Sequence, residues 1–166
     1  MHYPDLSEYS YNLPFGLPGV INVGWLSRSH EFSVGSVSQE AILELEKSVV
    51  SRRANQTRGF HICELCDAVK PVRLISASGD ERLLGSAELW FPSLGGGPVY
   101  VAPDLIAHYV RVHGYAPPDE FIAAVLAART ATKWNPDEER RMRVHAAFVH
   151  SADSMQRGGK TPPLGG

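Results

Sequence analysis

Apolar residues recur with helical spacing in the stretch that follows Ser38. Ile42, Leu45 and Val49 lie three and four positions apart, so they would share one face of a helix. Ser38 is itself a favoured N-cap residue, because its hydroxyl can accept a hydrogen bond from a free backbone N–H of the first turn. The pattern therefore predicts an amphipathic helix that begins after Ser38 and fades near residues 54–55.

Three further helices are expected in the second half of the chain: Asp104 to His113, Pro118 to Arg129, and Asn135 to about Ser151. The first stops before Gly114, and glycine is the residue that most easily takes the left-handed cap conformation. The second opens with a proline and two acidic residues, and the third with Asn-Pro-Asp-Glu-Glu. Both openings are typical of helix N-termini.

Short apolar runs between turn residues predict the strands. Val20 to Leu26 is one, and Val72 to Ile75, Leu83 to Phe91 and Pro98 to Val101 are three more. The last three follow one another closely, so the region from Pro71 to Val101 is expected to form a small antiparallel β-meander. Together with the helices this predicts an α+β fold, with several helices packed on the meander.

Length and composition indicate one globular domain. The chain has 166 residues, of which 43% are hydrophobic and 20% are charged, close to the values of ordinary folded proteins. From Ala152 onward Gly, Pro, Lys and Ser dominate and apolar residues are scarce, so little surface is available for burial. We therefore expect one domain over residues 1–151 and a flexible tail over residues 152–166.

The formal net charge of −2 gives the chain no general attraction to nucleic acid or to membranes. The segment from Met1 to Asp5 lacks the basic start and apolar core of a signal peptide. No apolar run approaches the roughly 20 residues that span a bilayer. These features predict a cytoplasmic protein, in which thiols stay reduced and disulfides are rare.

Two pairs of residues have the spacing of a structural zinc site. Cys63 and Cys66 are separated by two residues, and His108 and His113 by four. Structural zinc takes four tetrahedral ligands, commonly two cysteines two to four residues apart and two histidines three to five residues apart. The sequence therefore predicts one structural Zn²⁺ per chain, held by these four side chains. Because a long insert separates the pairs, the ion would staple a whole domain, in a zinc-finger-like or treble-clef-like manner.

The histidine pair poses a geometric condition. Two residues five positions apart on an ideal helix point about 140° away from each other. Both can reach one ion only if the helix changes at its end, where Gly114 permits a tightened or unwound last turn.

His61 is the rival ligand. In extended chain His61 and Cys63 point the same way, so His61 could replace His113 or support the site from outside. A thioredoxin-like redox pair is less well supported, because that chemistry places Cys-x-x-Cys at the start of a helix. Here Pro71 and a β-rich stretch follow instead.

Three blocks of the sequence resemble the signatures of a bacterial protein family of unknown function. They read Asn22-Val23-Gly24-Trp25-Leu26, then Arg58-Gly59-Phe60-His61-x-Cys63-Glu64-x-Cys66, then Ala102-Pro103-x-Leu105-Ile106-x-His108-Tyr109 through His113-Gly114-Tyr115-x-Pro117-Pro118-x-Glu120-Phe121. The resemblance spans roughly Tyr3 to Val125. It implies a bacterial source and a single domain, and it carries no activity.

The function that this pattern favours is a zinc-stapled interaction or adaptor module whose partner is another protein. The aromatic residues of the N-terminal arm would supply the contact surface: Tyr3, Tyr9, Tyr11 and Phe15. One alternative is a zinc hydrolase or deaminase, in which Glu64 would act beside an open coordination position. The chain lacks the His-x-Glu and Pro-Cys-x-x-Cys elements of the deaminases. A second alternative is a nucleic-acid-binding zinc module that uses the basic segment Arg52 to Arg58.

Overall fold

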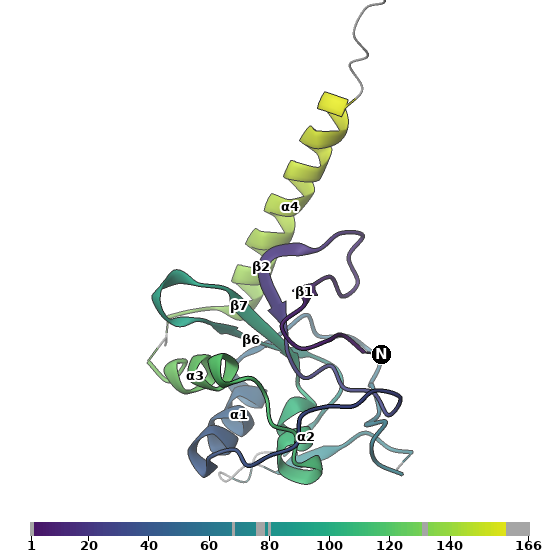
Figure 1. Ribbon diagram of the computed structural model, residues 1–166, viewed down its shortest axis with the longest axis vertical. Coiled ribbons are helices and arrows are strands. Elements are labelled where there is room, and N and C mark those ends of the chain that lie inside the picture. Colours follow the sequence, from purple (N-terminus) through teal and green to yellow (C-terminus); the bar gives the residue numbers. More distant parts are fainter. Residues whose placement is uncertain (1, 68, 76–78, 80, 131–132, 159–166) are drawn as a thin grey trace, which may run out of the picture.

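The predicted α+β class is confirmed by the computed structural model, which describes residues 2–67, 69–75, 79, 81–130 and 133–158. Helices α1 (Gln39–Ser51), α2 (Ile106–His113), α3 (Asp119–Ala127) and α4 (Pro136–Gly158) are joined to short strands (Figure 1). The strands are β1 (Glu8–Tyr9), β2 (Leu17–Asn22), β3 (Arg53–Ala54), β4 (Arg73–Ile75), β5 (Glu81–Leu83), β6 (Glu88–Pro92) and β7 (Val99–Pro103). A 3₁₀ turn, η1 (Leu94–Gly96), links β6 to β7.

The strands expected to form one meander lie in two separate sheets. β4 and β5 pair only with each other, whereas β6 and β7 belong to a five-stranded sheet of order β1-β2-β7-β6-β3. The expected strand from Leu83 to Phe91 is interrupted at Gly85, whose φ of 99° is a backbone conformation that glycine adopts easily. β2 runs parallel to β7, with Val20 opposite Val99, so the sheet is mixed rather than wholly antiparallel.

The hairpin of β6 and β7 is buried on both faces because its alternate residues face opposite sides. Leu89, Phe91 and Tyr100 belong to a core cluster that also contains residues of α1, α2 and α3. Trp90 and Val101 belong to a second cluster, which contains residues of β1 and β2 and contacts α4. The sheet therefore lies between two layers, with α1, α2 and α3 on one side (Figure 1).

The helix boundaries follow the capping residues seen in the sequence. The Ser38 hydroxyl accepts a hydrogen bond from the N–H of Ala41 at 3.3 Å and caps α1. The Asn135 side chain accepts from the N–H groups of Asp137 and Glu138 and caps α4. Since α4 continues to Gly158, it runs seven residues beyond the expected end near Ser151. Residues 159–166 of the expected tail lie outside the described residues.

The prediction that the N-terminal aromatics form an exposed contact surface is wrong. Tyr9 and Tyr11 are buried in the second core cluster, because the arm folds back as β1 against β2. Tyr3 packs edge-on against Trp25, and Phe15 packs edge-on against a phenylalanine of α4. These rings therefore build the core instead of a docking patch.

No helix in the described part of the chain combines the length and the apolar character that crossing a membrane would require.

Candidate metal centre and adjoining pocket

The four predicted metal ligands come together at one point of the fold. One ligand atom from each of Cys63, Cys66, His108 and His113 lies within 4.8 Å of all the others. The Nε2 atoms of the two histidines are 3.1 Å apart. Cys66 Sγ lies 3.2 Å from His108 Nε2 and 3.3 Å from His113 Nε2, and Cys63 Sγ lies 3.4 Å from His113 Nε2. The four residues are therefore close enough to bind a single metal ion.

The four separations given above are close to those around a tetrahedral ion. With ligand distances of about 2.3 Å to sulfur and about 2.05 Å to nitrogen, a regular tetrahedron places two nitrogens ~3.3 Å apart and nitrogen and sulfur ~3.6 Å apart. The separations in the chain are a few tenths of an ångström shorter. Two sulfurs and two imidazole nitrogens in this arrangement form the donor set that zinc prefers.

The end of α2 meets the geometric condition on the two histidines. Gly114 takes a left-handed conformation, with φ of 65°, and caps the helix as predicted. The N–H groups of Gly114 and Tyr115 both donate to the carbonyl of Tyr109, which widens the last turn. The widened turn brings the ring of His113 against that of His108, with the ring centres 4.9 Å apart.

The turn that carries the cysteines is held from outside by Arg28. Its Nε donates to the carbonyl of Glu64 at 2.6 Å, and its terminal nitrogen donates to the carbonyl of Cys66 at 3.1 Å. The Ser27 hydroxyl donates to the Glu64 carboxylate at 2.8 Å. Because these groups fix the backbone between the two cysteines, they orient both sulfurs. Ser27 and Arg28 lie far from the cysteines in the sequence, so the sequence did not predict that they would support the cysteine turn.

Burial affects the protonation of two of these residues in the metal-free protein. Burial and, to a smaller extent, the charge of the neighbouring His113 lower the pKa of His108 to about 4, so its ring is neutral at neutral pH and one ring nitrogen has a free lone pair. Burial also raises the pKa of the Cys63 thiol. A bound cation would offset this effect, since the ligand is the thiolate and metal binding displaces the proton.

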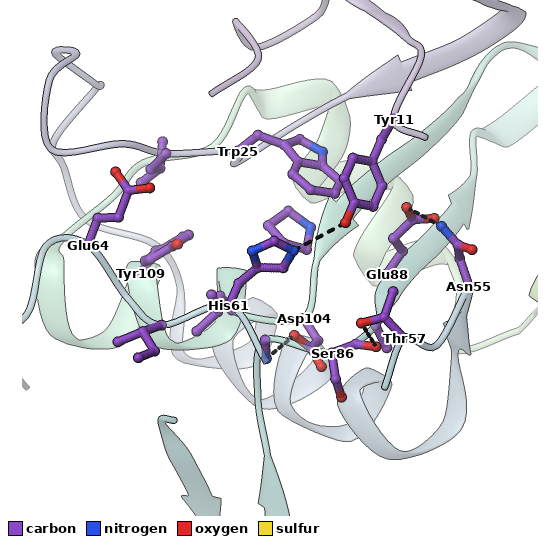
Figure 2. Close-up of a pocket in the computed structure, with 16 residues that line it drawn as sticks. Tyr11, Trp25, Asn55, Thr57, His61, Glu64, Ser86, Glu88, Asp104 and Tyr109 are labelled. Carbon is purple, nitrogen blue, oxygen red and sulfur yellow. Dashed lines mark hydrogen bonds between the residues drawn. The ribbon is translucent and has the colours of Figure 1, made fainter. Parts of the chain in front are cut away.

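His61 lies apart from the cysteine and histidine cluster. Its Nε2 is 3.1 Å from the Tyr11 hydroxyl, and its backbone N–H donates to the carbonyl of Gly85 at 2.7 Å. The backbone of Gly85 approaches so closely that a Cβ built there would lie 2.0 Å from the carbonyl oxygen of His61. The His61 side chain lines a pocket beside the metal centre (Figure 2) and does not belong to the group of four ligand residues.

That pocket brings together residues from segments far apart in the sequence, including Tyr11, Trp25, His61, Glu88 and Asp104. It has a volume of about 60 Å³. Figure 2 shows the rings of Trp25, Tyr11 and His61 on one side and the two buried carboxylates on another. No local motif could have identified it, because the tertiary fold alone makes these residues neighbours.

The buried carboxylates of the pocket are held by several donors. Glu88 accepts from the hydroxyl of Tyr9, the amide of Asn55 and the indole N–H of Trp90. Asp104 accepts from the N–H of Gly85 at 2.6 Å and forms an ion pair with Arg53 at 3.2 Å. Burial raises the pKa of Glu88, and it raises the pKa of Asp104 to about 6.

Two of the three arginines in the basic segment from Arg52 to Arg58 are directed inward, whereas Arg58 is exposed. Arg52 is 9% exposed and donates to the carbonyl of Ala128. Arg53 holds Asp104 and the Ser86 hydroxyl. The guanidinium groups of Arg52 and Arg53 therefore form hydrogen bonds within the fold, and the exposed basic surface is smaller than the sequence suggested.

Comparison with known proteins identifies a family but no characterised relative. The model of a family described as a domain of unknown function (DUF7919) matches residues 1–126. No curated protein matches the chain, and no solved structure matches it.

Proposed function

We propose that this chain, which belongs to that family of unknown function, is a zinc protein in which the ion has a structural role. The observation that carries the proposal is the convergence of two thiol sulfurs and two imidazole nitrogens within 4.8 Å of one another. Four protein ligands complete a tetrahedron and leave no position for water, which is the arrangement of structural rather than catalytic zinc sites.

The ion would join two segments that are far apart in the sequence, since Cys66 and His108 are 42 positions apart. Cys63 and Cys66 lie in an irregular segment, whereas His108 and His113 lie on α2, which is packed into the core. Binding free energy at such a site is folding free energy, because the unfolded chain has no preformed site. Zinc would therefore stabilise the cysteine turn against α2.

The same closed donor set favours an interaction or adaptor module over a zinc enzyme. A hydrolase or deaminase needs an open position and a carboxylate that faces the bound water. Glu64 accepts hydrogen bonds from Ser27 and from the N–H of Arg28, so its carboxylate is directed toward residues 27–28. That the partner is another protein stays a prediction, because the aromatic rings expected to form its contact surface pack into or against the core. A nucleic-acid partner is less well supported, because Arg52 and Arg53 are engaged inside the fold.

The test is metal content together with coordination. Protein purified without chelators should contain one zinc per chain, and Cys63→Ser should lose the metal and melt at a much lower temperature. Cobalt substituted for zinc should give the intense visible bands of a four-coordinate tetrahedral ion. Protein without metal would overturn the proposal of a zinc protein, and a cobalt spectrum with a bound, exchangeable water would overturn the structural role.

A further inference from the structure

The pocket beside the metal centre has an aromatic wall. Trp25 and Tyr11 have ring centres 5.0 Å apart, and the ring of His61 lies 6.3 Å from that of Tyr11. Tyr109, which is 4% exposed, contributes a further ring to the lining. The volume of about 60 Å³ is several times the roughly 10–15 Å³ that a single water needs. The space is therefore larger than one water needs, and aromatic rings surround it.

The charges around the pocket have one sign. Glu64, Glu88 and Asp104 all line it, and the described lining residues include neither lysine nor arginine. Arg53 offsets part of the charge of Asp104, and Arg140 lies near enough to Glu88 to affect it, but both arginines stand outside the lining. A ligand in this space would therefore meet acidic side chains and the negative faces of aromatic rings, while the cations that balance the carboxylates lie outside the lining.

The hydrogen-bonding capacity of the two buried carboxylates is already used by protein donors. Three donors occupy the oxygens of Glu88, and those of Asp104 accept from Gly85 and Arg53. A primary amine would need acceptors for its N–H groups, which these oxygens are poorly placed to supply. A quaternary ammonium has no N–H to satisfy and is attracted by charge and by aromatic faces alone.

We propose that this pocket binds a small free organic cation with an alkylated ammonium group. Trp25 and Tyr11 would present their ring faces to the cation, and Glu88 and Asp104 would supply the negative field without direct contact. The site is distinct from the metal centre, although Ile62 and Glu64, on either side of Cys63, form part of its lining.

Three probes of nearly the same shape and different charge test the proposal. They are choline, its neutral isostere 3,3-dimethylbutan-1-ol, and the anion 3,3-dimethylbutanoate, each titrated into the full chain and followed by NMR shifts or by calorimetry. A cation–π contribution of about 1–2 kcal/mol corresponds to about 5- to 27-fold in affinity. Choline should therefore bind at least about fivefold more tightly than the alcohol, and the anion should bind most weakly. Equal affinity for choline and the alcohol, or no saturable choline binding in the millimolar range, would overturn the proposal.

Two variants locate the binding. Trp25→Leu should bring the choline-to-alcohol affinity ratio close to one, because it removes an aromatic face. Tyr11→Phe is the matched control: it removes the hydroxyl near His61 but keeps the ring, so the ratio should be unchanged. The ratio does not depend on how much of a variant is folded, since both probes need the folded pocket. If Trp25→Leu keeps the choline-to-alcohol affinity ratio of the wild type, choline binds elsewhere and the assignment is overturned. Metal content measured on the same samples separates a failure of this proposal from a failure of the zinc proposal.

Discussion

Replacing one histidine at a time distinguishes residues that bind the metal from residues that only lie near the metal centre. His113→Ala removes a nitrogen that lies 3.1–3.4 Å from three other ligand atoms. His61→Ala removes a ring whose Nε2 lies against the Tyr11 hydroxyl, outside the cluster. We expect zinc affinity to fall far more in the first variant than in the second.

The size of the difference follows from the number of ligands. Structural zinc binds zinc-finger peptides with an apparent free energy of about 10–16 kcal/mol, which is about 2.5–4 kcal/mol for each of four ligands. Loss of His113 should therefore weaken zinc binding on the order of 60- to 700-fold. His61 lies two residues before Cys63 and outside the group of four ligand residues, so its loss should cost at most the tenfold to hundredfold that is typical of supporting groups.

Competition with a chromophoric zinc chelator measures both affinities on the full-length chain. Circular dichroism of each variant, with and without zinc, shows whether the fold has survived. If His61→Ala loses the metal while His113→Ala retains it, three ligands come from the segment around Cys63, and the argument from the widened end of α2 is refuted.

Three further predictions concern the scaffold. Gly85→Ala should lower the melting temperature much more than Gly95→Ala, since both glycines have positive φ but only at Gly85 would the Cβ meet the backbone of His61; equal losses would show that this close approach does not matter. The pKa of Asp104 rises from about 3.9 in an unfolded chain to about 6 in the fold, so this group contributes stability that is lost as pH rises from about 4 to about 6, whereas His108, whose pKa is lowered to about 4, contributes with the opposite sign. The difference in unfolding free energy between the wild type and Asp104→Asn isolates the contribution of Asp104 and should fall over this pH range in denaturant titrations; a constant difference would contradict the assignment. Deleting residues 152–166 should leave metal content and melting temperature unchanged, and a large loss of stability would move the domain boundary.

The metal ligands could be identified from the sequence because short-range geometry selects them. A pair of cysteines two residues apart and a pair of histidines at a helix end each need only local chain to face one point. Gly114 showed where α2 ends, since the left-handed conformation suits glycine. Helix caps such as Ser38 were readable for the same reason, because the capping hydrogen bond spans only three residues.

The tertiary structure alone decided the pairing of strands and the surroundings of the site. Val20 pairs with Val99 across almost half of the chain, and no local pattern specifies such a partner. The sequence suggested that Tyr9 and Tyr11 belong to an exposed arm. Their burial could not be predicted locally, because it depends on what the arm folds against, here Trp90 and Trp25. The pocket has the same origin: its walls come from distant segments, so its shape and charge exist only once the sheet has brought them together.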